Sequence, residues 1–340
     1  MAKYFKAIII MLWLSGLTSC EKLIFPEIKT DNLSVFDDIY RHANENYVFF
    51  EYKNIDWEAI YHTYRPLVSN DMSDEDFFEL CTAFVHELRD GHSNIRKGGH
   101  VNWWLGFKDG TNPNFDKQLL FETYLENDYK TFGRLIAKKM DGIGYVYIEN
   151  FWYADEHESF NELLSYFQDT QGLIIDVRSN GGGSNFAAKI IPGHFTTQRY
   201  AAEQWLYKSG KAWNDFSEPY WLYIEETGPV KYLRPTIVLT NRGSYSSANS
   251  FVNFMRYLPT VTLMGDTTGG GAGVPRPCML ANGWEFYTVD TKCLDVQENQ
   301  MELGIAPDIY VEMDDNNPGV DEILERALER LSLKLPSKHY

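Results

Sequence analysis

The sequence is short of positive charge. Its 340 residues contain 31 Lys and Arg against 48 Asp and Glu, which gives a formal net charge of −17 at pH 7. A phosphate backbone would be repelled on balance, so we exclude nucleic acid as a partner. The same acidity argues against loose adsorption to an anionic membrane surface, so any membrane association would have to be covalent or inserted.

The sequence also lacks an apolar run of the ~20 residues that a membrane-spanning helix needs. A shorter apolar stretch, 7–14, follows Lys3 and Lys6 and precedes small residues. A basic start, a short apolar segment and small residues before a cleavage site are typical of a secretory signal peptide. We therefore interpret residues 1–20 as a signal peptide.

The end of this signal, Leu17-Thr18-Ser19-Cys20, resembles a bacterial lipobox. The resemblance implies cleavage before Cys20, a lipid on its sulfur, and a tether over residues 21–30. The expected location is the bacterial cell envelope, with the protein lipid-anchored to a membrane. An ordinary signal peptide followed by an incidental cysteine is the alternative.

Cysteine is scarce, with four in the chain. Cys81 falls in the apolar pattern of a helix predicted over 74–88 and is interpreted as a core residue. Cys278 and Cys293 could form a disulfide in an envelope protein, and free buried thiols fit the sequence equally well. His86 and His92 are six residues apart, unlike the His-x-x-x-His pattern of metal sites, so neither a metal nor another cofactor is predicted.

Composition predicts a folded protein with a sizeable core. Hydrophobic residues make up 44% and charged residues 23% of the chain, as in globular proteins. The length allows one large or two medium domains. The many aromatic residues are explained mainly by stacking in the core, and some could line a groove for an extended polypeptide. Nothing in the sequence specifies an oligomeric state.

Three regions follow one another after the tether. Residues 31–97 are predicted to form a helical subdomain, because Leu33, Phe36 and Ile39 recur at helical spacing and Ser73 precedes an acidic first turn. Residues 98–141 form an aromatic-rich connecting segment with a strand expected around 118–125. Residues 142–335 alternate between strand and helix patterns of hydrophobicity. Strands are predicted near 143–149, 172–177, 235–240, 260–265 and 284–290, and helices near 156–169, 184–193, 247–257 and 319–333. This alternation predicts an α/β core.

Ser246 occupies the most informative position in this core. A β-branched strand ends at about Thr240, turn residues follow, and a helical pattern begins after Ser246. A serine at such an elbow has its hydroxyl beside the free amides of a helix N-terminus, which suits a nucleophile. Serine is also a preferred helix N-cap, which is the alternative interpretation.

A glycine turn offers what such a nucleophile needs. The strand ending at Asp176 leads into Gly181, Gly182 and Gly183 and then a helix. Consecutive glycines let backbone amides face a ligand, as half an oxyanion hole requires. The Gly-x-x-x-x-Gly-Lys-Ser/Thr and Gly-x-Gly-x-x-Gly patterns of nucleotide sites are absent. A turn held by an Asp176–Arg178 pair is compatible with this interpretation.

His92 follows a helix that breaks at Gly91. An imidazole with an ordinary pKa of about 6.5 can accept a proton from a serine hydroxyl and return it to a leaving amine near neutral pH. His92 is therefore the candidate general base. A histidine just after a helix is also common as a cap or surface residue.

Together these segments resemble the C-terminal-processing serine peptidases, and more closely the branch that includes the tricorn core protease. The resemblance implies a crotonase-like ββα superhelix, polypeptide substrates, Ser246 as nucleophile and His92 as base. It also implies oxyanion donors from the Gly182/Gly183 turn and the Ser247 amide, and an acidic residue, Glu302, that could orient the imidazole. The matching motifs are Leu88-Arg89-Asp90-Gly91-His92, 143–148 with Phe151, 176–183, Ser244-Tyr245-Ser246-Ser247-Ala248, 265–271 and 302–308.

The sequence departs from the family pattern in several places. Glycine stands in 269–271, where the better known branch carries a lysine base, so a serine–lysine dyad is not expected. Gly91 replaces a serine of the tricorn branch, and Asn249 stands where many relatives carry glutamate. Many relatives also carry a PDZ domain of about twice the length of 98–141 between the same landmarks, so gating by a PDZ domain is not expected.

The sequence thus predicts an envelope serine endopeptidase that forms an acyl-enzyme on Ser246. A catalytically silent protein that binds peptides or apolar ligands on the same scaffold is the alternative from another class, favoured by Gly91 and Asn249. An esterase using the same residues differs only in the leaving group.

Overall fold

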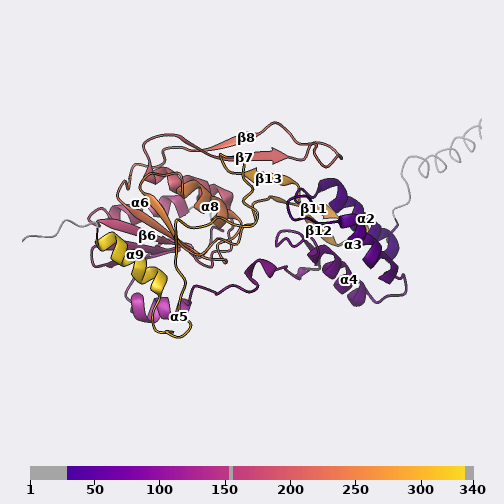
Figure 1. The fold of residues 1–340 in the computed structure, drawn as a ribbon, viewed down its shortest axis with the longest axis horizontal. Coiled ribbons are helices and arrows are strands. Elements are labelled where there is room, and N and C mark those ends of the chain that lie inside the picture. The colour runs from indigo at the N-terminus through magenta and orange to yellow at the C-terminus, as the bar shows by residue number, and fades with distance from the viewer. Residues whose placement is uncertain (1–28, 153–155, 334–340) are drawn as a thin grey trace, which may run out of the picture.

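A seven-stranded sheet organises the larger part of the molecule (Figure 1). The computed structural model describes residues 29–152 and 156–333. Five neighbouring strands of the sheet are parallel, and an antiparallel pair lies at one edge. In spatial order the strands are β14 (Ile309–Tyr310), β10 (Val261–Gly265), β9 (Thr236–Thr240), β6 (Gly172–Asp176), β5 (Ile143–Tyr147), β4 (Leu135–Met140) and β3 (Lys130–Phe132).

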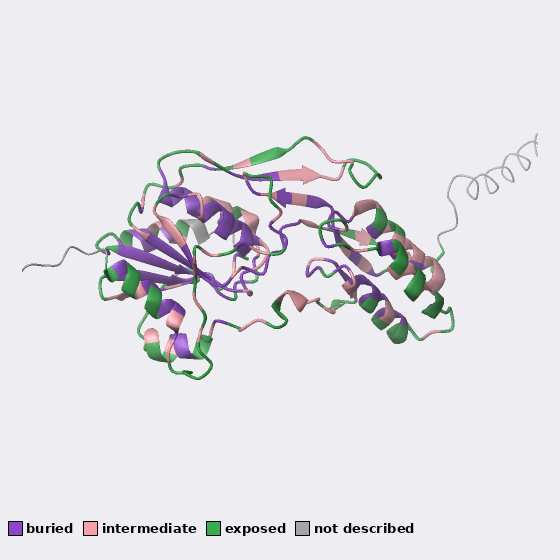
Figure 2. Cartoon of the chain, viewed as in Figure 1, coloured by how far each residue is buried: buried purple, intermediate pink, exposed green. Residues whose placement is uncertain are grey.

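Helices cover both faces of this sheet, so its central strands are buried throughout (Figure 2). On β6, Leu173 and Ile175 join one core cluster while Ile174, pointing the other way, joins another. A strand covered on both faces is apolar along its whole length, as 172–176 is. The first cluster packs against α6 (Glu156–Tyr166), α7 (Asn185–Ile190) and α8 (Ser247–Met255), and the second packs against α9 (Glu322–Ser332). The predicted α/β core is confirmed.

A buried charge cluster fastens α9 to the end of β6. The guanidinium of Arg178 donates to both carboxylate oxygens of Asp176 and to both of Asp321, at 2.7–3.1 Å. Asp321 also caps α9 by accepting from the Leu324 amide, and Asp176 accepts from the Tyr145 hydroxyl. All of these side chains are buried. The sequence predicted the Asp176–Arg178 pair and missed Asp321.

The N-terminal region is helical, as predicted. It contains α2 (Asn32–Asn46), α3 (Trp57–Tyr64), a short 3₁₀ turn η1 (Arg65–Leu67) and α4 (Asp74–His86). Ser73 caps α4, its hydroxyl accepting from the Asp76 amide. Aromatic rings fill the core between the helices, with Trp57 stacked on Phe84 at 4.3 Å between centroids.

The chain returns to this helical region from far along the sequence. β1 (Asn94–Lys97) pairs with β2 (His100–Val101) on one side and with β12 (Glu285–Val289) on the other, and β11 (Pro275–Met279) completes a four-stranded sheet. Phe286 and Trp284 lie in the same core cluster as the helices. The predicted subdomain of 31–97 therefore lacked residues 275–289, since pairing between such distant segments leaves no local signal.

A second connection runs over the top of the molecule (Figure 1). It is a three-stranded sheet in the order β13 (Thr291–Leu294), β7 (Tyr200–Tyr207) and β8 (Tyr220–Ile224), preceded by the 3₁₀ turn η4 (Ile191–Phe195). β13 follows β12 directly along the chain, so this sheet reaches from the α/β core toward the helical region.

The strand expected around 118–125 is wrong. These residues form α5 (Lys117–Leu119) and one π-helical turn, η3 (Leu120–Tyr124), after the 3₁₀ turn η2 (Gly106–Lys108). The Asp116 carboxylate accepts from the amides of Gln118 and Leu119 and so caps the helix. Leu120 and Leu125 then pack on the face of the sheet that α9 covers.

The signal sequence and Cys20 lie outside the described residues, as does most of the tether. Within the described ranges, no helix combines the length and apolar character needed to cross a membrane. The described cysteines, Cys81, Cys278 and Cys293, are free thiols, so the optional disulfide is not formed. Cys81 is buried in the helical core as expected.

Replacement of Arg178 should destabilise the fold strongly. We expect Arg178→Met to lower the free energy of unfolding by about 3–5 kcal/mol, because two buried carboxylates lose their counter-charge. Arg199→Met is the matched control, since Arg199 pairs with Glu225 at the surface and should matter by less than about 1 kcal/mol. Urea denaturation of both variants measures the difference. Equal, small losses would show that the cluster does not stabilise α9.

Candidate active site

Ser246 immediately precedes α8 and has a strained backbone conformation, with φ 59° and ψ −122°. It occupies the N-cap position, but its side chain makes no capping hydrogen bond, so the hydroxyl is not used to cap the helix. A non-glycine residue in this region costs free energy and is found mainly where function requires it. The Ser246 amide donates to the Gly270 carbonyl at 2.9 Å, which helps to hold the elbow.

His92 reaches Ser246 from the helical region. Its Nε2 lies 3.0 Å from Ser246 Oγ, across 154 residues of sequence. The loop that carries His92 is fixed by Asp90, whose Oδ1 accepts from the His92 amide at 2.8 Å. Asn94 donates to the His92 carbonyl at 3.0 Å and closes the other side of the loop. The structure thus brings together the two side chains that the sequence singled out.

The pKa of His92 is lowered from its ordinary value of 6.5, chiefly because burial disfavours the imidazolium. The negative charge of Asp90 opposes this shift, and the positive charge of Lys53 adds to it. The imidazole is therefore neutral at pH 7 and able to accept a proton. Its Nδ1 is buried without a well-formed hydrogen bond among the described residues, although the backbone of Gly273 interacts with the ring and raises the pKa.

Two free amides flank Ser246. Among the residues that the structure describes, the amides of Gly183 and Ser247 donate to no acceptor, and both residues line the same cleft as Ser246. The Ser247 hydroxyl donates to the Gly183 carbonyl at 2.7 Å and ties the glycine turn to α8. These two amides are therefore the candidate donors to an oxyanion.

Gly182, the third predicted donor, has another role. Its amide already donates to Asn180 Oδ1 at 2.9 Å. Its φ is +96°, and an added Cβ would lie 2.8 Å from the Tyr245 carbonyl oxygen and 2.9 Å from the Ser247 amide nitrogen. Glycine at this position therefore allows the turn to approach α8 closely, and the expectation that its amide is free is wrong.

Glu302 does not contact His92. Its Oε1 accepts from Lys53 Nζ at 2.7 Å, and its Oε2 accepts from the Ala272 amide at 2.9 Å. The expected direct orientation of the imidazole by this carboxylate is therefore not seen. Burial and the nearby charge of Asp90 raise the pKa of Glu302, and Lys53 counters them.

Lys53 is the residue that sequence reasoning missed. Its ammonium is buried, donates to Glu302 and to the Arg89 carbonyl, and lies 3.8 Å from Asp90 Oδ2. It therefore links the helical region, the loop of His92 and the catalytic core. No motif marks it, because its partner Glu302 is 249 residues away along the chain.

Gly91 and Asn249, two of the departures from the family pattern, are both accommodated by packing. An added Cβ at Gly91 would lie 2.8 Å from the Tyr245 hydroxyl, so the tyrosine fills the space that a side chain there would need. Asn249 is fully buried, accepts from Thr268 Oγ1 at 2.6 Å and donates to the Met301 carbonyl at 3.2 Å. Asn249 thereby holds the loop that carries Glu302.

An aromatic cleft of about 570 Å³ surrounds Ser246 and His92. Trp103, Trp104, Phe107 and Trp152 line it, and Trp152 is 69% exposed. Exposed rings around a concave site are suited to binding apolar groups. Within the described residues, no group of His, Cys, Asp or Glu side chains could hold a metal ion. A strained serine, a neutral imidazole and two free amides define a site of the serine-hydrolase class.

The chain belongs to peptidase family S41. The model of that family matches residues 142–311, and the model of the tricorn protease C1 domain matches residues 29–85. The resemblance to C-terminal-processing peptidases and to the tricorn branch is therefore confirmed.

Two curated proteases are similar to parts of the chain. The carboxy-terminal processing protease CtpB of Bacillus subtilis is 28% identical over 185 residues, which cover 52% of this chain and 36% of that protein. The tricorn protease of Thermoplasma volcanium is 26% identical over 239 residues, covering 66% of this chain and 21% of that protein. The chain thus matches about a third or less of the length of these relatives.

One solved structure is similar over nearly its full length. It is a candidate peptidase from Parabacteroides merdae, 36% identical to this chain, with a TM-score of 0.84. The match covers 89% of this chain and 97% of the other. This likeness extends over both the helical region and the α/β core.

Removal of the Lys53 charge should impair the site and also lower the stability of the protein, because buried Glu302 loses its partner. We expect Lys53→Met to slow the reaction of Ser246 with a fluorophosphonate about 100-fold, since a displacement of about 1 Å at a reacting pair costs that much. Lys211→Met, which removes an exposed lysine, is the control.

The second-order labelling rate is the measurement, with thermal unfolding as a check on folding. In a double-mutant cycle, Lys53→Met and Glu302→Gln should be non-additive because the two side chains are paired. A wild-type labelling rate in folded Lys53→Met would refute this role.

The pH dependence of the same reaction should reflect the lowered pKa of His92. As the pH falls through that pKa, the imidazole gains a proton and can no longer accept one from Ser246. On the acid side of the pH profile, the labelling rate should therefore fall to half its maximum at a pH below 6.5. Lys53→Met removes a positive charge that lowers the pKa of His92, so the labelling rate of this variant should fall at a higher pH than that of the wild type. A wild-type midpoint at or above 6.5 contradicts this prediction.

Proposed function

We propose that this protein is a serine endopeptidase that cleaves polypeptides through an acyl-enzyme on Ser246. The single observation that carries the proposal is the 3.0 Å separation of His92 Nε2 and Ser246 Oγ at a strained elbow beside two free amides. Membership of peptidase family S41 supports peptide-bond hydrolysis.

In the first half-reaction, His92 acts as general base. Its Nε2 takes the proton of the Ser246 hydroxyl while Oγ attacks the peptide carbonyl carbon. Negative charge then develops on the carbonyl oxygen, where the amides of Gly183 and Ser247 donate to it. The C–N bond breaks as the imidazolium returns its proton to the leaving amine.

In the second half-reaction, water replaces the amine. His92 takes a proton from the water, which attacks the acyl carbonyl, and the same two amides stabilise the second oxyanion. Breakdown releases the carboxylic acid and returns the proton to Ser246 Oγ. The neutral imidazole that burial favours is the form that both attacks require.

The silent binding protein is the weaker alternative. It was favoured by Gly91 and Asn249, and both are accounted for by packing against Tyr245 and Thr268. A binding protein would gain nothing from a strained serine beside an imidazole.

Loss of the base should abolish the reactivity of Ser246. We expect His92→Ala to reduce peptide or ester turnover by about 10³-fold or more without unfolding the protein, as removal of a catalytic base does. Turnover, and mapping of the residue labelled by a fluorophosphonate, are the measurements, with Ser246→Ala as the blank. His86→Ala is the matched control, because the His86 imidazole bonds to the Asn102 carbonyl and His86 does not line the cleft around Ser246. Full activity in His92→Ala would overturn the assignment.

We also propose that the protein acts in the bacterial cell envelope, anchored by a lipid on Cys20. The support is Leu17-Thr18-Ser19-Cys20 after a basic start and a short apolar segment. A single acyl chain binds a membrane only marginally and several chains bind it stably, so the anchored protein should resist salt washing and need detergent for release.

Cys20→Ser should release the protein from the membrane, because the thioether to the lipid requires sulfur. Membrane fractionation and the mass of the mature N-terminus are the measurements. Retention of Cys20→Ser in the membrane fraction, or a wild-type terminus without lipid mass, would disprove the anchor and leave the catalytic proposal intact.

A further inference from the structure

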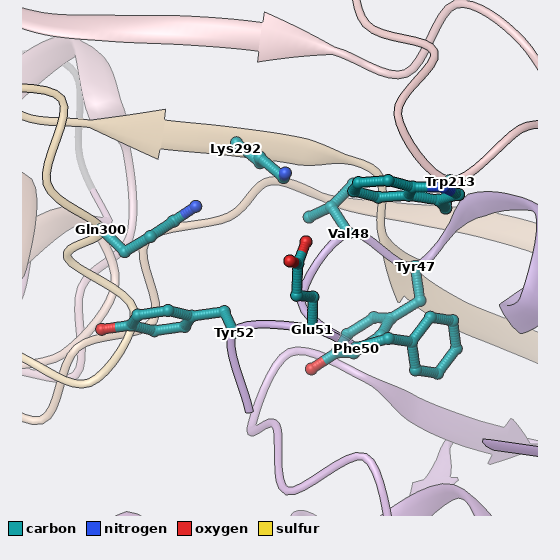
Figure 3. A pocket seen from close by; sticks show the side chains of 8 residues that line it. All are labelled: Tyr47, Val48, Phe50, Glu51, Tyr52, Trp213, Lys292 and Gln300. Atoms are coloured by element: carbon teal, nitrogen blue, oxygen red, sulfur yellow. The ribbon is translucent and has the colours of Figure 1, made fainter. Parts of the chain in front are cut away.

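A second cavity lies between the helical region and the three-stranded sheet (Figure 3). Its volume is about 490 Å³, and it shares no lining residue with the cleft around Ser246. Its walls come from the loop after α2, from Trp213 between β7 and β8, and from β13 with the loop that follows it. The proposed catalytic steps make no use of it.

Aromatic rings form the apolar part of this cavity. Tyr47 and Phe50 meet at 5.0 Å between ring centroids, with their planes 71° apart. Tyr52 is 40% exposed and Trp213 is 68% exposed, so a large aromatic surface faces water at the opening. Covering such rings with an apolar side chain would be favourable, and aromatic anchors dominate many binding sites.

Charged groups of both signs point into the same cavity without forming an ion pair with each other. Figure 3 shows the Glu51 carboxylate and the Lys292 ammonium directed into it from opposite sides. Neither forms an ion pair within the described part of the chain, and Lys292 lies over the Phe216 ring, 4.2 Å from its centroid. Burial lowers the pKa of Lys292, and Glu51 opposes this shift, so the two charges interact across the space.

Gln300 adds an unmet hydrogen-bonding group. It lines the cavity, and its Oε1 is buried with no hydrogen-bond partner among the described residues. Figure 3 shows the amide nitrogen of Gln300 directed toward the cavity. The cavity therefore offers an acceptor at Glu51 and donors at Lys292 and Gln300.

The loop that supplies most of this wall is held in place. The Tyr47 hydroxyl donates to the Leu88 carbonyl at 3.1 Å, and the Lys53 amide donates to the Phe49 carbonyl at 2.9 Å. The Lys53 side chain is itself fixed by Glu302. A cavity formed on such a loop exists before any ligand binds, which reduces the entropic cost of binding.

We propose that this cavity is a second, non-catalytic polypeptide-binding site that takes one bulky apolar side chain of an extended segment. A main-chain amide beside that side chain donates to Glu51, and main-chain carbonyls accept from Lys292 and Gln300. Peptide groups supply the N–H and C=O groups that this set requires, and the rings cover the side chain. The inference rests on the proposed function only in that polypeptide substrates are the ligand class.

The test uses the Ser246→Ala protein, so that binding is measured whether or not Ser246 is catalytic. The probe is a fluorescein-labelled, amidated peptide of sequence Gly-Ser-Gly-Phe-Gly-Ser-Gly, followed by fluorescence anisotropy. We expect saturable binding that is lost when the peptide's Phe is replaced by Asp. Trp213→Ala and Lys292→Met, added to the same protein, should each weaken it about tenfold or more, as loss of an anchor does.

Tyr310→Ala, which removes an exposed ring outside both the cavity and the cleft around Ser246, is the matched control and should leave the affinity within about twofold. Weakening by Trp152→Ala, which removes a ring of the cleft around Ser246, together with no effect of Trp213→Ala would assign the peptide to that cleft and overturn the proposal. Absence of saturable binding would also overturn it. Thermal unfolding of each variant, expected to match that of Ser246→Ala, separates loss of the site from loss of the fold.

Discussion

The hydrogen bond between His92 Nε2 and Ser246 Oγ can form only if two separate parts of the molecule are held in place. His92 follows the helical region, and Ser246 immediately precedes a helix of the α/β core. A separation of 3.0 Å between such parts requires that they be fixed relative to each other. The return of β11 and β12 to the helical region, and the Lys53–Glu302 pair, provide that restraint.

Two buried charge networks occur in the molecule, one within the α/β core and one between the core and the helical region, and each joins segments that are distant along the chain. Arg178 connects the end of β6 to the start of α9, and Lys53 connects the loop after α2 to Glu302. A buried ion pair stabilises little on balance, because desolvation offsets much of the attraction, whereas removal of one partner is costly. Such pairs therefore penalise every arrangement in which the partners do not meet. We interpret both networks as contacts that specify which segments meet in the folded protein.

The contacts around Gly91 and Asn249 explain these two departures from the family pattern. Tyr245 lies against Gly91 and its ring is 5.1 Å from that of His92, so the wall that supports the imidazole comes from the residue before Ser246. Tyr245 is in turn stacked on Phe107 at 4.3 Å. Asn249 binds Thr268 and the Met301 carbonyl and so places the loop before Glu302. Packing against Tyr245 and hydrogen bonds to Thr268 and Met301 thus account for Gly91 and Asn249 at these positions.

Local periodicity and turn residues were enough to predict the α/β core with its main strands and helices, and to single out Ser246, His92 and the glycine turn at Gly183. The Ser247 amide was added by the resemblance to the family. Contacts between distant segments could not be predicted in this way. The tertiary structure brought β11 and β12 to the helical region, paired Glu302 with Lys53, engaged the Gly182 amide with Asn180 and made 118–125 helical. Those outcomes depend on contacts between distant segments and on competition for the same donors, and the order of residues along a chain does not reveal which partner a side chain reaches.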